Sequence, residues 1–188
     1  HAATIEIGVG KPVKRIKEGI ALAKEGDTVL VHAGVYKEGN IVIDKPLTFL
    51  GKGNPTLDGQ KKFEPLSIKS HGVLVQGFTF KSSGYSSLDD IAGVKIYNTY
   101  DVRIIDNILD DNFFGVYSQN CKRLEIRGNK IRAYGKAEQL IGNGIHGWKS
   151  DSLDIRENEI IGHRDGLALQ IAGVFQHIGL GDVHRGGD

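Results

Sequence analysis

Histidine and cysteine side chains are the groups of this chain that could hold a metal ion. Imidazole sites need two or more ligands that converge, and His146 and His163 are spaced so that a folded repeat could bring them together. Copper sites favour sulfur or clustered imidazole, but the chain has one cysteine, Cys121, and no methionine. Copper is therefore possible rather than established, with His146 and His163 as its candidates. Solvated or hydrogen-bonded histidines are the alternative.

A second group of side chains could bind a larger partner. Aromatic rings with polar tips suit sugar rings or a protein surface. An Arg-Asp pair can grip a partner or bond within its own turn. The candidate binding residues are Tyr97, Tyr117, His146, Trp148, Arg164 and Asp165. An external ladder of rings that only stabilises the fold is the alternative for the aromatic members.

Paired carboxylates would be needed for most sugar chemistry. Polygalacturonase-type hydrolysis uses two acids at a fixed separation, and pectate-type lyases use calcium held by carboxylates with a basic residue. The only paired acids are Asp89-Asp90 and Asp110-Asp111, and both pairs lie in polar turn sequence. Because adjacent side chains point apart, no catalytic residue is assigned. The sequence favours a non-catalytic protein over a polysaccharide lyase or hydrolase.

A repeat must position these residues. Gly93, Gly115, Gly144 and Gly166 are 22, 29 and 22 residues apart, and the longer step contains an insertion after Ile131. Each of the first three glycines precedes two short alternating apolar segments and then an asparagine. A unit of about 20–25 residues with short strands predicts a stacked repeat. No helical segment follows these strands, so we predict an all-β fold, a parallel β-helix. The general rule that connections between parallel strands are right-handed predicts a right-handed parallel β-helix.

The alternation in each segment predicts which side chains face inward. The inner positions after the glycines are Val94, Val116, Ile145 and Leu167. The outer positions then form two columns, Lys95, Tyr117, His146 and Ala168, and Tyr97, Gln119, Trp148 and Gln170. Because neighbouring coils lie about 4.8 Å apart, the aromatic residues of the two columns form one contiguous patch. At the strand ends, Asn107, Asn129 and Asn158 are expected to adopt left-handed turns and to form a ladder.

The first third of the chain differs in kind. Val13, Ile16, Ile20 and Ala23 share one face at helical spacing, which predicts an amphipathic helix over residues 11–24 that covers the open end of the stack. We expect a single domain over residues 1–188. Its coils span residues 28–169, and the degenerate tail spans residues 170–188.

Charge and composition exclude several classes of protein. The formal net charge is +1 and the charged residues are scattered, so nothing indicates a nucleic-acid partner. No run of 18 apolar residues is present, so we expect no membrane span. The chain starts with His1-Ala2-Ala3, which would suit removal of an export signal peptide after small residues; a chosen sequence boundary would explain it equally well.

Longer segments resemble a known family. GDTVLVHAGVYKEGNIVIDKPLTFLGKG (26–53) resembles the opening coils of pectin-lyase-like β-helices. The segments that are similar to the NosD family are GVLVQGFTF (72–80), DNFFGVY (111–117), GNGIHGW (142–148) and IRENEIIGHRDG (155–166). This resemblance implies an exported, periplasmic accessory protein for maturation of the copper centre of nitrous oxide reductase. Its implied partners are ABC transporter components and the reductase.

The chain departs from the family pattern in places. Gly147 stands before Trp148, and Leu167-Ala168 follow Gly166, where the family has other residues. Family members continue with further coils, so the resemblance implies a chain that is truncated relative to them. A carbohydrate-binding or carbohydrate-active β-helix of the pectate lyase or epimerase type remains the alternative.

Overall fold

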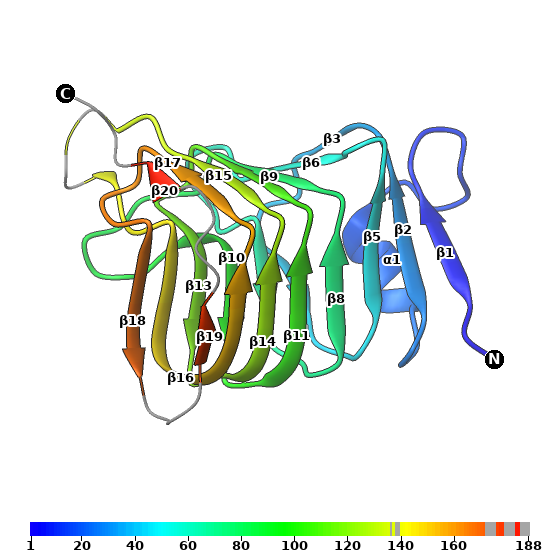
Figure 1. Cartoon of the computed structure of the whole chain (residues 1–188). Coiled ribbons are helices and arrows are strands. Elements are labelled where there is room, and N and C mark those ends of the chain that lie inside the picture. Colours follow the sequence, from blue (N-terminus) through cyan, green and yellow to red (C-terminus); the bar gives the residue numbers. More distant parts are fainter. Residues whose placement is uncertain (136, 138–139, 172–175, 179–182, 185–188) are drawn as a thin grey trace.

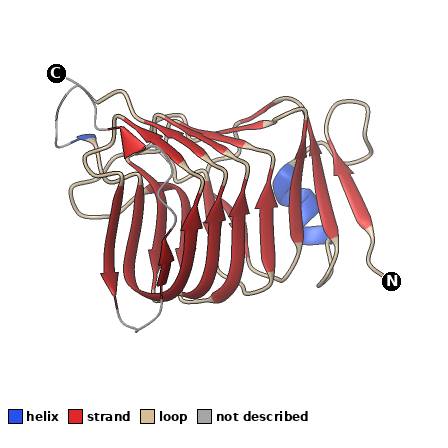
Figure 2. Cartoon of the chain, in the orientation of Figure 1, coloured by secondary structure: helices blue, strands red, loops and turns tan. Residues whose placement is uncertain are grey.

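The chain folds into a right-handed parallel β-helix whose coils are stacked from the N-terminal to the C-terminal end (Figure 1). The structure is a computed structural model, and it describes residues 1–188 except 136, 138–139, 172–175, 179–182 and 185–188. Each full coil contributes one strand to each of three parallel sheets, which we name A, B and C. Along the chain each coil follows the order sheet C, sheet A, sheet B. Figure 2 shows the strands stacked in rows. The predicted fold is therefore confirmed.

The three sheets run the length of the stack. Sheet A contains β1 (Thr4–Ile7), β2 (Thr28–His32), β5 (Thr48–Lys52), β8 (Val73–Gln76), β11 (Tyr100–Ile105), β14 (Lys122–Arg127), β16 (Ile145–Arg156) and β19 (Gln176–Ile178). Sheet B contains β3 (Val35–Tyr36), β6 (Thr56–Asp58), β9 (Thr79–Lys81), β12 (Ile108–Asp110), β15 (Lys130–Arg132), β17 (Glu159–Ile161) and β20 (Val183–His184). Sheet C contains β4 (Ile41–Ile43), β7 (Leu66–Ile68), β10 (Ala92–Tyr97), β13 (Phe114–Gln119), β16 and β18 (Leu167–Ile171). Strand β16 turns a corner and belongs to sheets A and C.

The glycine repeat has the register that its spacing predicts. Val94 pairs with Val116, Val116 with Ile145, and Ile145 with Leu167 across adjacent strands of sheet C. The first three of these side chains are at most 1% exposed, in one continuous core that all three sheets enclose. Burial of this narrow apolar column is the main favourable term that holds each coil on the next.

The N-terminal helix is shorter than predicted. Helix α1 spans Ile16–Leu22, while residues 11–15 are not helical and Val13 forms a β-bridge with Ile7. Helix α1 lies at the N-terminal end of the stack (Figure 1), and its Ile16 and Ile20 are buried in the core. In the later coils a sheet C strand, such as β4, comes directly before a sheet A strand, such as β5. Helix α1 comes directly before the sheet A strand β2, so it takes the place of a sheet C strand in the first coil.

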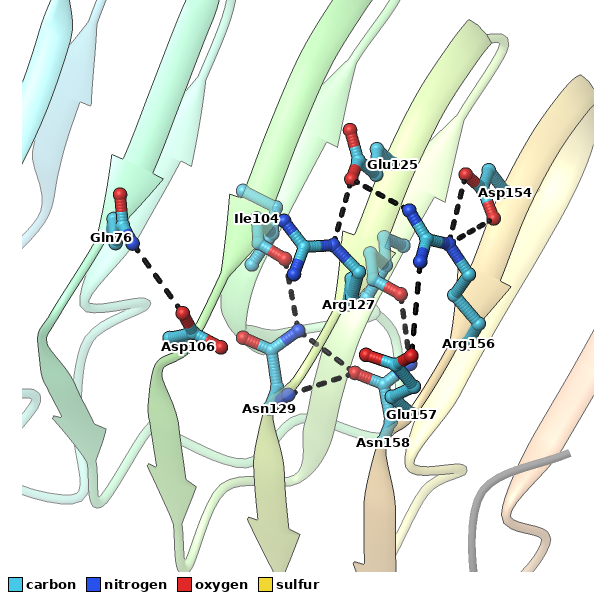
Figure 3. Close-up of polar contacts among 11 residues, drawn as sticks. Gln76, Ile104, Asp106, Glu125, Arg127, Asn129, Asp154, Arg156, Glu157 and Asn158 are labelled. Carbon is cyan, nitrogen blue, oxygen red and sulfur yellow. Dashed lines mark hydrogen bonds and ion pairs between the residues drawn. The ribbon is translucent and has the colours of Figure 1, made fainter. Parts of the chain in front are cut away.

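An asparagine ladder lines the corner between sheets A and B. The side chain of Asn129 donates to the carbonyl oxygen of Ile104 and to Asn158 Oδ1 (Figure 3), and its own Oδ1 accepts the backbone N–H of Asn107. The ladder was predicted, but the left-handed turn at these asparagines was wrong. The residues with positive φ at these corners come one position earlier: Asp106, Gly128 and Glu157. The asparagine side chains thus point inward, where buried amides need partners.

The outer face of sheet A carries a separate ladder of charges (Figure 3). Glu125 accepts hydrogen bonds from Arg127 and Arg156, and Arg156 also donates to Asp154. These side chains are partly exposed, and exposed ion pairs contribute about 0–1 kcal/mol each. Because equivalent positions of neighbouring coils lie side by side, coil stacking alone accounts for this row of charged side chains.

Strands continue beyond residue 169. Strand β19 pairs with β16, and β20 pairs with β17, so the sheets extend past the point where the repeat pattern fades. Within the predicted tail, residues 172–175, 179–182 and 185–188 lie outside the described residues.

Candidate functional site on the outer face of sheet C

The outer face of sheet C brings the candidate aromatic residues together in the predicted register. Lys95 pairs with Tyr117 and Tyr117 with His146, while Tyr97 pairs with Gln119 and Gln119 with Trp148. Outward direction does not mean exposure here, because Tyr117 is only 4% exposed and Lys95 only 8%.

A second apolar cluster outside the coil core accounts for this burial. Phe114 and Tyr117 pack with Ala92, and Phe113 and Trp148 lie against them. The ring of Phe114 meets the ring of Tyr117 edge-on at 5.0 Å between centroids. Since the coils already have a complete core inside, this cluster is not required to close the β-helix.

Loop residues 82–91 are fixed on this face by Asp90. The hydroxyl of Tyr117 donates to Asp90 Oδ2 at 3.0 Å, and Lys95 Nζ donates to the Asp90 carbonyl oxygen at 2.9 Å. The Lys95 ammonium also lies 4.9 Å from the ring centroid of Tyr97 and 4.7 Å from that of Tyr117. Cation–π contacts of this kind strengthen when they are desolvated. Burial and the Asp90 carboxylate raise the pKa of Tyr117, which keeps its hydroxyl protonated as the donor.

Glu64 is the acidic group at the N-terminal side of the site. Its Oε2 accepts hydrogen bonds from Ser67 Oγ at 2.5 Å and from the Tyr97 hydroxyl at 2.8 Å, and its Oε1 accepts the backbone N–H of Ala92 at 3.2 Å. Burial raises the pKa of Glu64 above its ordinary value, against these hydrogen bonds and the charge of Lys95. A carboxyl group whose ionisation is opposed by burial thus lies within a network of hydrogen-bond donors.

The two candidate metal-binding histidines both contact the dipeptide Gly142-Asn143, which precedes them in the chain. His146 Nδ1 is 2.9 Å from Asn143 Nδ2, and His163 Nδ1 is 3.0 Å from the Gly142 carbonyl oxygen. A carbonyl oxygen can only accept, so His163 Nδ1 carries the proton and Nε2 has a lone pair. That buried Nε2 has no hydrogen-bond partner among the described residues. Burial lowers the pKa of both histidines, so both are neutral at neutral pH.

Arg164 and Asp165 lie at the edge of the site, in the turn before β18. The backbone N–H of Arg164 donates to the Gly142 carbonyl oxygen, and the Asp165 carbonyl oxygen accepts the N–H of Gly144. Both residues are exposed and hold the loop of residues 133–144 through their backbone. Trp148 is half-buried, with the Lys149 ammonium 4.5 Å from its ring centroid.

Sequence reasoning missed three polar members of this face. Lys95 stood in the outward column beside Tyr117, and that register could have identified it. Asp90 was assigned to a solvated turn and Glu64 was not considered. Their roles depend on loop paths between coils, which strand periodicity does not encode.

The sequence of this chain is similar to known proteins. A family profile described as "Periplasmic copper-binding protein (NosD)" matches residues 13–174, which is most of the chain. The chain belongs to the NosD family. A curated relative, "Probable ABC transporter binding protein NosD" from Pseudomonas aeruginosa, is 27% identical over 151 residues, which are 79% of this chain and 35% of the relative. The chain thus spans about a third of the length of that NosD protein.

The fold also has a structural relative. The crystal structure of the pectin methylesterase from Aspergillus niger in deglycosylated form aligns with a TM-score of 0.40 at 12% identity, over 90% of this chain and 85% of that one.

In the described part of the NosD chain, no helix is long and apolar enough to cross a membrane.

The description of the NosD family implies copper binding, so we ask whether the side chains of this chain could hold a copper ion. Among the described residues, no three His, Cys, Asp or Glu side chains gather where they could share one ion. The Cys121 thiol is buried and donates to the carbonyl oxygens of Ile96 and Gln119, and burial raises its pKa. His146 and His163 each form their hydrogen bond through Nδ1, which leaves the Nε2 nitrogens as the candidate donors. Without a third donor beside them they do not fit a copper site, which would need donors from outside the described residues.

Proposed function

We propose that this chain acts as a NosD-type periplasmic accessory protein in maturation of the copper centre of nitrous oxide reductase. In this role it works with an ABC transporter and catalyses no reaction of its own. The family membership supports the general class. The contact surface of this proposal is the outer face of sheet C around Tyr117, His146 and Trp148, with Arg164 and Asp165 at its edge.

The second apolar cluster is the observation that carries the proposal. Coil stacking alone does not need Phe114, Tyr117 and Trp148 outside the core. The network around them also desolvates Lys95 and raises the pKa of Glu64, both of which cost free energy. Rigid aromatic side chains with polar neighbours are what the centres of protein interfaces contain. In this proposal Trp148 is the anchor, because it is the half-buried ring that lies on the strand face itself, where a partner could still cover it, whereas the half-buried Phe113 lies in a turn.

Substitution of Trp148 tests the assignment. An aromatic anchor costs about 2 kcal/mol or more when it is truncated, so Trp148→Ala should weaken capture of the cognate transporter and reductase components at least about 30-fold. The matched control is Tyr100→Ala, which removes a ring that is 40% exposed at the start of β11, away from sheet C. Equal capture by Trp148→Ala and the parent chain would show that this surface is wrong. Cleavage of an acidic polysaccharide by the purified chain would instead support the carbohydrate-active alternative and overturn the accessory role.

A further inference from the structure

A notch lies at the edge between sheets B and C, and Trp148 is not among its lining residues. Three successive connections line it: the long loop 82–91, the short turn 111–113, and residues 133–135 and 140–141 of the third connection. The short turn comes between the two longer connections in chain order. The cavity between them has a volume of about 500 Å³, within the range of about 300–1,000 Å³ that is usual for small-molecule sites.

Aromatic rings from all three connections line this notch. Phe113 lies in the middle turn, Tyr85 meets its ring edge-on at 5.5 Å, and Tyr134 comes from the opposite loop. Tyr85 is 48% exposed and Tyr134 is 59% exposed. The hydroxyl of Tyr134 donates to Asp110 Oδ1 at 2.6 Å, so its ring is held in place before any ligand arrives. Such preorganisation reduces the entropy cost of binding.

Polar groups of both charges complete the lining. Lys61 and Asp111 are exposed residues with positive φ at the notch, and each offers a charged group to a ligand. Asn112, in contrast, is fully used by the fold, since its amide bonds the backbone of Ser83 and Phe80. The ligand must therefore offer flat apolar faces to the rings, and hydroxyl or charged groups to Lys61 and Asp111.

We propose that this notch binds a hexopyranose unit of a glycan. The C–H faces of a pyranose ring pack on the electron-rich faces of Tyr85 and Tyr134, and its hydroxyls donate to Asp111 and accept from Lys61. A single apolar peptide side chain would fill the space between the rings but leave both charged groups without partners. This site does not require the accessory role proposed above, because Trp148, Tyr117 and Lys95 do not line it. The two sites are neighbours, since Phe113 of the notch also packs against Phe114 of the second apolar cluster.

Ligand-detected NMR with the whole chain and a panel of disaccharides tests the proposal. Maltose and chitobiose represent neutral rings and digalacturonate represents acidic ones. We expect saturation transfer to at least one of them, and chemical-shift changes at the amides of Gly84 and Gly135. Tyr85→Ala and Tyr134→Ala should each weaken binding about tenfold or more through loss of a stacked face. A preference for digalacturonate that Lys61→Gln removes would identify the acidic ring as the ligand.

The matched control is Tyr100→Ala, since Tyr100 is another exposed tyrosine outside the notch. Thermal unfolding midpoints of the two notch variants verify that they remain folded. If Tyr134→Ala does not fold, Tyr134→Phe provides a milder change at the same position. The proposal is overturned if no saccharide contacts the notch at tens of millimolar, or if Tyr100→Ala weakens binding equally. Binding of a phenylalanine-bearing peptide at the same amides, without any saccharide, would make the notch a peptide site and also overturn it.

Discussion

The imidazole ring of His146 stacks on the phenol ring of Tyr117, with 4.8 Å between ring centroids and 22° between the ring planes. The two residues pair across β13 and β16, so the stack forms directly from the coil register. Tyr117 in turn bonds Asp90 of the loop above it. One outward column therefore joins sheet C to the loop that covers it, and a neutral His146 is part of that packing.

The first prediction concerns the stability of the fold below neutral pH. Burial lowers the pKa of His146 and of His163 in the folded state, relative to about 6.5 in an unfolded chain. As the pH falls below about 6.5, the unfolded chain binds protons that the folded chain does not, so the free energy of unfolding decreases. Urea unfolding between neutral pH and pH 5 should show this decrease.

Substitution identifies the histidines as its source. His146→Gln should flatten part of the pH dependence, because one of the groups that binds a proton only on unfolding is lost. His71→Gln is the control, because His71 is an exposed histidine stacked on Tyr100. An unchanged slope in His146→Gln, or the same change in both variants, would contradict the assignment.

The second prediction concerns the proton on Glu64. Burial raises its pKa, while the hydrogen bond from Tyr97 opposes this by stabilising the carboxylate. Tyr97→Phe removes that donor and should raise the pKa of Glu64 further. A carbon-detected NMR titration of the glutamate carboxyl groups measures both values. Tyr134→Phe, which loses a hydroxyl bonded to Asp110 instead, should leave the Glu64 titration unchanged. A lower pKa in Tyr97→Phe would mean that the hydrogen bond favours the protonated acid.

Sequence periodicity was sufficient to predict the coils. The glycine column is informative because a Cβ atom on Gly144 would lie 2.8 Å from the carbonyl oxygen of Gly166 in the next coil, and one on Gly115 would meet Gly144 in the same way. Close approach of backbones is a steric requirement that recurs between the coils of Gly115, Gly144 and Gly166, so it leaves a repeated residue there. The outward register of Tyr117, His146 and Trp148 follows from the same repeat.

The loops could not be predicted in this way. The path of residues 82–91 decides that Asp90 meets Tyr117 and that Lys95 becomes buried. Such contacts join residues of different coils through turns whose length varies, and no period in the sequence records them. The shorter helix α1 has a similar cause, because Val13 forms a β-bridge with Ile7 of β1 instead of following helical propensity.

The third prediction concerns how the N-terminal helix is held. Helix α1 has no side-chain cap of its own, and the Glu38 carboxylate accepts the backbone N–H groups of Ile16 at 2.8 Å and Lys17 at 3.0 Å. Glu38→Ala should lower the free energy of unfolding by about 1 kcal/mol, because it removes both the cap and a negative charge at the helix N-terminus. Urea unfolding measures the change. Lys37→Ala, next to it and exposed, should cost less than about 0.5 kcal/mol; equal losses would contradict capping from outside the helix.

The last prediction separates the inner asparagine ladder from an outer one. Asn129 is fully buried, and its amide serves the backbone of Asn107 and of Ile104. Asn129→Ala leaves those groups without side-chain partners and should cost about 2–4 kcal/mol. Asn120 donates to Asn98 in an exposed ladder at another corner. Its φ of 51° makes glycine the suitable replacement, and Asn120→Gly should cost less than about 1 kcal/mol. Urea unfolding measures the free energy of unfolding of the two variants. Similar losses would contradict the prediction, because they would mean that burial of the ladder adds little to its contribution to stability.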